Sequence, residues 1–212
     1  MIVRQGCVSY DIAMKKVLLT LTLVSLCAGC AIIPEQVEVN YAPDPAAPRT
    51  PIMSVGAVQL QVVDTRHAES PNWIADKKNG YGMRMASVTA QRPVADLVRD
   101  ALAQELTARG VRLGEGRMIV AVEVTRLESV GQTRFFSIGA IGSADLSVQV
   151  RRMDGTIAYA RTFSVSNDEE AGLAGTPGQS RRAVERALSK VVGQTVSDPA
   201  FVRALSMEPR MT

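Results

Sequence analysis

Cysteine is scarce in this chain of 212 residues, and all three cysteines lie within the first thirty positions. They are Cys7, Cys27 and Cys30. Because no cysteine follows, the rest of the chain has no internal disulfide, no cysteine-based metal site and no thiol nucleophile. Its folding is therefore expected to need no oxidising compartment.

Histidine is scarcer still, because His67 is the only one. A Ser-His-Asp arrangement would need this residue, and Asp64 is close to it, but the chain has no Gly-x-Ser-x-Gly turn. The acidic run at 168–170 is interpreted as a solvated turn rather than a cation site. The glycine-rich stretch at 172–178 lacks the Lys-Ser/Thr pair of a phosphate-binding loop. No catalytic residue, cofactor or metal ion is predicted.

Aromatic residues are few, at 4%, and the chain has no large excess of charge of either sign. The formal net charge is +3, and removal of residues 1–29, with three cations and one anion, would lower it to +1. Such a balance predicts no basic face and hence no nucleic-acid partner. The remaining residues, about 180, suffice for one core, which must be built from aliphatic side chains.

The first thirty residues do carry a sorting signal. Lys15 and Lys16 precede an apolar run at 17–26, and small residues then lead to Cys30. This charged, apolar, small-residue order is typical of a secretory signal, with Met14 as the predicted true start. The apolar run is much shorter than the roughly 20 residues that span a bilayer.

Residues 26–30, Leu-Cys-Ala-Gly-Cys, resemble a bacterial lipobox. The resemblance implies that the Cys30 thiol receives a diacylglycerol, that residues 1–29 are removed, and that the new amino group is acylated. Because Ala31 follows rather than aspartate, it also implies an outer-membrane address facing the periplasm. The alternative is an ordinary signal peptide cleaved nearby, which would leave Cys30 a plain thiol.

Proline is concentrated in the segment 30–51, which holds five of the ten prolines. This composition favours extended backbone, and the segment is interpreted as a tether that reaches on the order of 60 Å from the lipid. The alternative is an ordered arm, in which the alternating Val37, Val39 and Tyr41 add a short edge strand to the domain.

Residues 52–206 are predicted to form a single α+β domain, followed by a tail at 207–212. Strands are expected at 58–63, 83–89, 119–127, 144–151 and 157–165, and amphipathic helices are expected from Pro93 and Pro177, with a short final helix after Asp198. We expect a two-layer sandwich with a mainly antiparallel sheet of four to five strands and two amphipathic helices packed on one face. On the first helix, Glu105 and Arg109 are predicted to pair on the exposed side.

The order of these features resembles that of the YajG-like family of lipoproteins. The resemblance rests on the lipobox, the Val-Val-Asp-Thr-Arg strand end at 62–66, the helix at 94–109 that closes as Leu-Thr-Ala-Arg-Gly, the later hairpin and the late helix. Members of this family occur in Gram-negative envelopes and have no established molecular activity. The resemblance implies an outer-membrane lipoprotein that faces the periplasm, and it implies no catalytic residue.

The candidates for contact with a partner are Asp64, Arg66, Trp73 and Tyr81. The first two share a face of a strand, either as a recognition patch or, more simply, as a local ion pair at the strand end. The two aromatics are predicted in a long loop at 66–82, the expected partner-binding surface, where such side chains anchor interfaces or plug the edge of the core. The aromatic pair at 135–136 is expected to be buried.

The leading hypothesis is a non-enzymatic binding or scaffolding protein of the cell envelope, held at the membrane by its lipid, with an envelope protein as its partner. One alternative is an accessory subunit of a lipid-transport or cell-wall synthesis complex. A periplasmic hydrolase that uses His67 on cell-wall fragments is a third and unfavoured hypothesis.

Overall fold

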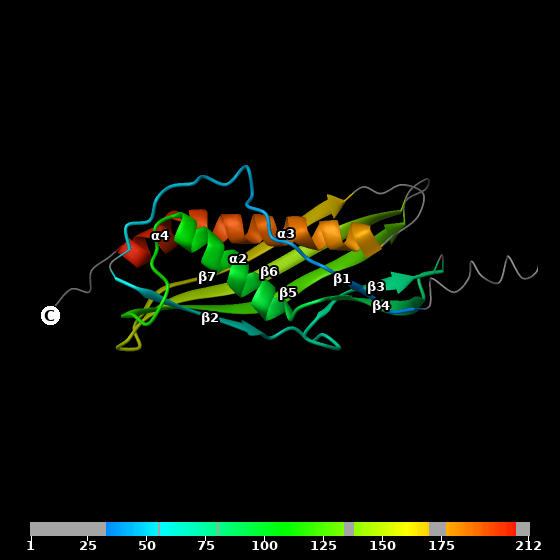
Figure 1. The fold of residues 1–212 in the computed structure, drawn as a ribbon, viewed down its shortest axis with the longest axis horizontal. Coiled ribbons are helices and arrows are strands. Elements are labelled where there is room, and N and C mark those ends of the chain that lie inside the picture. The colour runs from blue at the N-terminus through cyan, green and yellow to red at the C-terminus, as the bar shows by residue number, and fades with distance from the viewer. Residues whose placement is uncertain (1–32, 55, 80, 134–137, 170–176, 207–212) are drawn as a thin grey trace, which may run out of the picture.

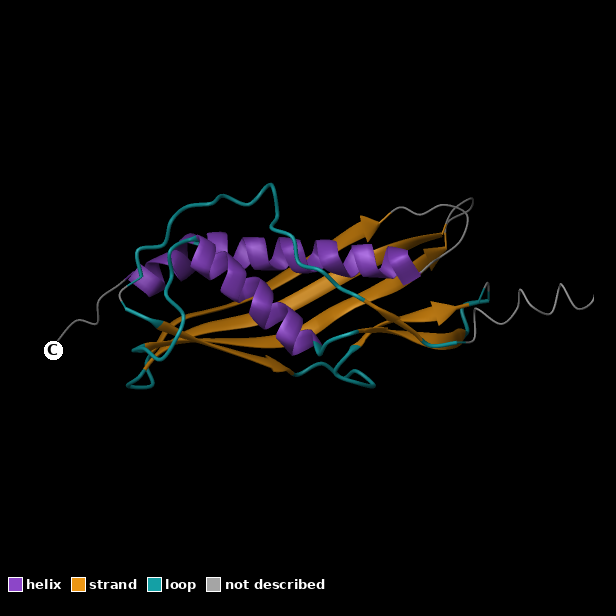
Figure 2. Cartoon of the chain, in the orientation of Figure 1, coloured by secondary structure: helices purple, strands orange, loops and turns teal. Residues whose placement is uncertain are grey.

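The computed structural model describes residues 33–54, 56–79, 81–133, 138–169 and 177–206. Within them, a seven-stranded sheet carries three helices on one side (Figures 1 and 2). The strands are β1 (Glu35–Val37), β2 (Val58–Asp64), β3 (Trp73–Lys78), β4 (Arg84–Ala90), β5 (Met118–Thr133), β6 (Ile138–Arg152) and β7 (Ile157–Glu169), and the helices are α2 (Val94–Ala108), α3 (Pro177–Ser197) and α4 (Pro199–Ser206). None of these helices is both long enough and apolar enough to cross a membrane.

Two strands share one edge of the central strand β5. β2 runs parallel to the first half of β5 and ends with Asp64 opposite Val124. β3 meets the same edge further along, where Ala75 lies opposite Ser129. The other edge of β5 pairs antiparallel with β6, and β6 pairs antiparallel with β7. Beyond β3, the sheet continues through β4 to β1.

The α+β class is confirmed, but the predicted sheet of four to five mainly antiparallel strands with two helices was too small, and the sheet is mixed. The sheet has seven strands, and the pairs β1–β4, β2–β5 and β3–β5 are parallel. β1 was anticipated only in the ordered-arm alternative, and the strand lies at Glu35–Val37 rather than along Val37, Val39 and Tyr41. In β3, a register shift after Trp73 leaves Ile74 and Ala75 both buried, so the alternation that indicates a strand is lost.

The long strands β5, β6 and β7 form the floor of the hydrophobic core. Their inward side chains are the alternating aliphatic residues that the sequence indicates, and those of Val120, Val122, Leu146 and Val148 are at most 1% exposed. α3 lies across these three strands, and α2 lies over β2. Burial of each such side chain contributes on the order of 1.5–3 kcal/mol, so the layers are held mainly by aliphatic packing.

The segment before β2 is an ordered arm from residue 33 onward, not a free tether. Its first part, β1, pairs in parallel with β4. It then passes over the outer side of the helices (Figure 2). There the N–H of Asn40 donates to Glu185 Oε1 at 2.9 Å, and Ser197 Oγ donates to the Pro48 carbonyl at 3.2 Å. The ordered-arm alternative therefore describes residues 33–51.

The arm covers an ion pair that was predicted to be exposed. Glu105 and Arg109 are only 6% and 4% exposed, with Arg109 Nε 3.4 Å from Glu105 Oε2. The hydroxyl of Tyr41, from the arm, donates to Glu105 Oε1 at 3.1 Å, and Arg109 Nη2 donates to Ser197 Oγ at 3.3 Å. Burial, followed by the nearby Glu105 carboxylate, raises the pKa of the Tyr41 hydroxyl. This buried network joins the arm to the ends of α2 and α3.

One glycine sets how closely α3 approaches the sheet. A Cβ atom on Gly142 of β6 would lie 2.0 Å from the backbone carbonyl oxygen of Ala183 in α3. The helix can rest at this distance only because residue 142 has no side chain, since backbone atoms cannot be displaced as a flexible side chain can.

We therefore expect Gly142→Ala to push α3 away from β6 and to lower the free energy of unfolding by about 1–3 kcal/mol, the usual range for overpacking. Denaturant unfolding of the full chain measures the change. Gly131→Ala in β5 is the matched control, because a Cβ atom there would meet nothing within 4 Å. Equal effects of the two substitutions would contradict the close-approach argument.

Candidate functional site

Several predicted features lie outside the described residues. These are Cys30, the aromatic pair at 135–136 and the glycine-rich residues up to 176. The acidic run at 168–170 was interpreted as a turn, but its first two residues are the last two of β7. Among the described residues, the candidate functional features lie around the edge of β5 that β2 and β3 share, and around α2.

Arg66 is buried, and its guanidinium uses all of its N–H groups within the protein. Its side chain is 5% exposed. Nε and Nη2 donate to the two carboxylate oxygens of Asp64, each at 2.8 Å. Nη1 donates to the carbonyls of Trp73 at 2.9 Å and Leu127 at 2.8 Å, and Nη2 also donates to that of Pro71 at 3.2 Å. No donor is left for a partner, so Arg66 acts as a structural brace.

This brace fills the interval between the two strands that share the edge of β5. β2 stops opposite Val124 and β3 meets β5 at Ser129, and β5 itself has a register shift just after Val124. In that interval, the Thr65 N–H donates to the Val124 carbonyl at 3.0 Å, and the guanidinium of Arg66 satisfies the Leu127 carbonyl. Backbone acceptors that neither strand reaches are thus paired by a side chain.

Asp64 holds the guanidinium in this orientation. Burial raises the pKa of the Asp64 carboxyl, but the hydrogen bonds from the Arg66 side chain and backbone N–H outweigh burial and hold that pKa below its usual range. The carboxylate therefore stays charged near neutral pH, when the bidentate pair is strongest. Of the two interpretations of Asp64 and Arg66, the geometry is that of the local ion pair.

Trp73 is also committed to internal contacts. It was predicted in a loop, but it is the first residue of β3 and is half-buried. Its indole Nε1 donates to Asp76 Oδ1 at 2.9 Å, and Asp76 also pairs with Arg84 Nε at 2.9 Å. The indole thus helps to close the edge of the core beside the brace.

Tyr81 differs from the other three candidates, because its side chain is 90% exposed. It lies in the turn between β3 and β4, next to Met83, which is 60% exposed. Of the four candidates, only Tyr81 offers its side chain freely to a surface outside the domain.

The described residues hold no constellation suited to catalysis by His67. Its side chain is exposed, and both oxygens of the nearby Asp64 accept hydrogen bonds from Arg66. A Ser-His-Asp arrangement needs a carboxylate free to orient the imidazole. Among the described residues, no group of three or more His, Cys, Asp or Glu side chains could hold a metal ion.

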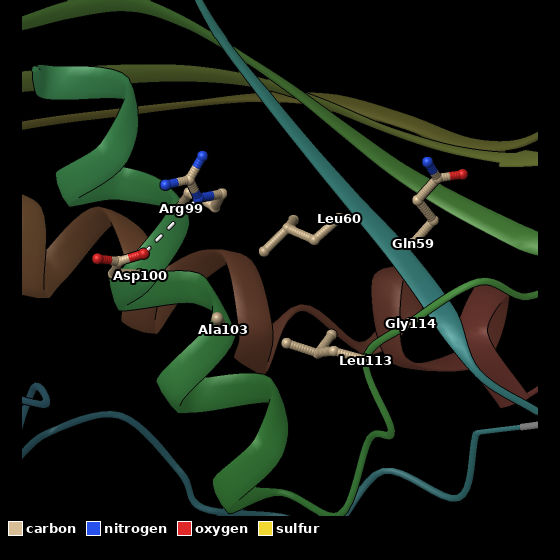
Figure 3. Close-up of a pocket in the computed structure, with 7 residues that line it drawn as sticks. All are labelled: Gln59, Leu60, Arg99, Asp100, Ala103, Leu113 and Gly114. Atoms are coloured by element: carbon tan, nitrogen blue, oxygen red, sulfur yellow. Dashed lines mark ion pairs between the residues drawn. The ribbon is translucent and has the colours of Figure 1, made fainter.

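A small pocket lies between α2 and β2, with a volume of about 290 Å³. Leu60 of β2 and Leu113 extend toward Ala103 of α2 and form its apolar wall (Figure 3). At its rim, Arg99 and Asp100 pair with each other, with Arg99 Nε 3.6 Å from Asp100 Oδ1. The pocket thus has an apolar wall, and the two charged side chains at its rim neutralise each other.

The outer edge of β2 borders this pocket and is open along most of its length. At its start, the Val58 N–H donates to the Arg112 carbonyl at 2.9 Å, and the Val58 carbonyl accepts from the Gly114 N–H at 3.0 Å. By strand alternation, the N–H and C=O groups of Leu60 and Val62 face the same edge. Within the described ranges, no strand pairs with the edge there. We call this edge, with the adjoining pocket, the β2 groove.

Sequence reasoning missed the β2 groove because both of its parts depend on tertiary structure. Leu60 and Val62 were expected to be core residues of a strand, and they are partly buried. Which edge of that strand stays unpaired follows only from its pairing with β5. The interruption of the sheet edge after Asp64 could not be predicted from the sequence either. The spacing of Asp64 and Arg66 indicated only a local ion pair at the end of the strand.

Comparison with known proteins gives a family and a fold. The Lipoprotein_16 family, described as uncharacterised lipoproteins, matches residues 43–206. Among solved structures, the chain is similar to protein XCC0632 from Xanthomonas campestris, of family DUF330, with 18% identity, a TM-score of 0.56, and coverage of 81% of this chain and 96% of that one. It is also similar to a minor lipoprotein from Acinetobacter baumannii, with 14% identity, a TM-score of 0.38, and coverage of 65% and 88%. No curated protein matches it in sequence.

We expect Arg66→Lys to destabilise the fold by about 2 kcal/mol or more. Lysine keeps the charge but cannot form the bidentate pair and reach three carbonyls at once, so buried acceptors lose their donors. The control is Arg84→Lys, whose side chain is more exposed and pairs with Glu69 at the surface, where pairs contribute about 0–1 kcal/mol. Denaturant unfolding of both variants compares them, and a loss in Arg66→Lys no larger than in the control would refute the brace.

Proposed function

The chain belongs to the Lipoprotein_16 family of uncharacterised lipoproteins, and we propose that it is a YajG-like lipoprotein anchored to the outer membrane through Cys30. On this proposal, its folded domain faces the periplasm and binds another component of the envelope without catalysing a reaction. The β2 groove is the surface on this chain that best suits such binding.

The proposed anchor is supported by the sequence around Cys30 and by the family. Residues 26–30 have the order of a lipobox, and the family that matches the mature part is one of lipoproteins. A buried acyl chain contributes about 0.8 kcal/mol per methylene, so several chains on one cysteine hold a domain firmly. Ala31, instead of aspartate, supports the outer-membrane address.

We expect Cys30→Ala to abolish labelling of the protein by palmitate and to release it from the outer-membrane fraction in cells. Density-gradient fractionation with palmitate labelling measures both effects. Cys7→Ala is the control and should leave both unchanged, because Cys7 precedes the predicted start at Met14. Retention of label and membrane address by Cys30→Ala would contradict the proposed anchor.

The non-enzymatic part of the proposal is supported by the family and by the chemistry of the candidate residues. The family description gives no sign of an enzymatic activity. The single histidine is exposed, and the carboxylate nearest to it in sequence is held by Arg66. A hydrolase that relies on His67 therefore has no observation in its favour.

The observation that supports binding is the open edge of β2. Unpaired N–H and C=O groups in a row are complementary to another extended backbone, and an added strand directs alternate side chains to one face. Here that face leads to the apolar pocket beside Leu60 and Leu113. Natural proteins usually protect such edges with charge or proline, and β2 has neither at Leu60 to Val62. We therefore propose that an extended segment of an envelope protein adds to β2.

Proline at residue 62 tests this directly. The N–H of Val62 faces the open edge, so Val62→Pro removes a donor that only an added strand would use, and edge strands tolerate such a proline. We expect photo-cross-linking in cells from the exposed position Gln61 to yield an adduct with an envelope protein. The adduct should fall about fivefold in Val62→Pro, because a lost hydrogen bond costs about 1 kcal/mol.

Val62→Thr is the matched control, because it keeps the N–H and the shape of the side chain, and it should retain the adduct. The cross-linker at Thr162, on the exposed part of β7, should give no such adduct. An adduct that survives Val62→Pro unchanged would rule out strand addition. A partner from a lipid-transport or cell-wall synthesis complex would identify the protein as an accessory subunit.

A further inference from the structure

The turn between β3 and β4 presents two exposed apolar side chains on a well-bonded backbone. Asn79 organises this turn: its side-chain oxygen accepts the N–H groups of Tyr81 at 3.0 Å and Met83 at 2.9 Å, and its carbonyl accepts that of Gly82 at 2.9 Å. Tyr81 is 90% exposed and Met83 is 60% exposed. The turn therefore holds large apolar groups in water, and they gain free energy when they are covered.

The start of the ordered arm lies beside this hairpin. Lys77 Nζ, near the end of β3, donates to the Ile33 carbonyl at 3.1 Å and pairs with Glu35 Oε2 at 2.9 Å. Figure 1 shows β1 entering the fold at the same end as the β3–β4 turn. Ile33 is itself 61% exposed. A third apolar side chain thus belongs to the same end of the molecule.

Chain length ties this end to the lipid. Cys30 precedes Ile33 by three residues, and three residues of fully extended chain span at most about 11 Å. In the parallel register of β1 and β4, Glu35 lies opposite Val88. The stretch from Glu35 back to Cys30 is as long as the stretch from Val88 back to Met83. A lipid on Cys30 would therefore be attached only three residues before the ordered arm begins, and this length of chain suffices to bring it level with the turn.

The size and charge of the turn indicate a lipid surface rather than a protein partner. Beside the turn, Lys78 is an exposed cation, whereas the charge of Arg84 is compensated by Glu69 and Asp76. A tyrosine buries about 150–250 Å², whereas specific protein interfaces bury roughly 1,200–2,000 Å². Tyrosine is enriched where protein meets phospholipid headgroups, and a nearby lysine such as Lys78 favours anionic lipids.

We propose that the β3–β4 turn is a membrane-contact surface, in which Tyr81, Met83 and Ile33 enter the headgroup layer beside the lipid on Cys30. The inference rests on the lipidation of Cys30 proposed above. The turn adds a second point of contact, which fixes the tilt of the domain on the bilayer. The β6–β7 turn, at the opposite end of the long axis in Figure 1, then faces away from the membrane.

Site-specific quenching tests the proposal on the full, lipidated chain. In the mature protein Cys30 is blocked by lipid, so Tyr81→Cys supplies a unique thiol for a fluorescent label. The labelled protein is reconstituted into phosphatidylethanolamine–phosphatidylglycerol vesicles that contain a phospholipid with a headgroup quencher. We expect the label at 81 to lose most of its emission. The matched control is Met153→Cys, exposed in the β6–β7 turn, which should lose little.

A second variant tests whether the apolar character of the turn matters. Adding Met83→Asp to the chain labelled at 81 should reduce the quenching, because a carboxylate opposes entry into anionic headgroups. Unquenched emission at 81 on a chain that floats with the vesicles would overturn the membrane contact while leaving the anchor intact. Equal quenching at 81 and 153 would also overturn it. A chain that fails to float would overturn the anchor itself, and this inference with it.

Discussion

The Arg66 guanidinium is the interaction on which the sheet depends, because it pairs backbone groups at a point that no strand covers. It takes both carboxylate oxygens of Asp64 and three carbonyls, including that of Leu127 in β5. Two strands can therefore share one edge of β5 without leaving buried acceptors unpaired between them. The Pro71 carbonyl also accepts the first N–H of α2, from Val94, so the brace is continuous with the start of the helix.

A second polar cluster closes the other side of the domain. Glu105 and Arg109 are buried because the arm lies over them, with Tyr41 donating to the carboxylate. Burial of an ion pair is costly unless its remaining groups are bonded. The arm supplies one of those bonds, and the end of α3 supplies another through Ser197. The start of the arm is held separately, because β1 pairs with β4 and Lys77 Nζ donates to the Ile33 carbonyl.

Regular elements could be predicted wherever the environment of the chain is uniform. The alternation in β6 and the apolar stripe of α2 each face one continuous layer, so the pattern of residues is the pattern of burial. The start of α4 after Asp198 was also predicted correctly, and Asp198 Oδ1 accepts the N–H groups of Ala200 and Phe201 there. Prediction failed for β3, where a bulge disturbs the period, and for Arg109, whose charged face is covered by a segment some sixty residues earlier in the chain.

The sequence by itself determined the features that act through neighbouring residues: the order of charge, apolar run and cysteine that resembles a lipobox, and the strand and helix periods. These can be read locally because their physical basis spans a few residues. Tertiary structure alone decided that Asp64, Arg66 and Trp73 point inward, that β2 keeps an open edge, and that Tyr81 lies at the end of the molecule where the arm begins. Each of these depends on which distant segment lies alongside, and that is fixed by packing across the sheet rather than by local preference.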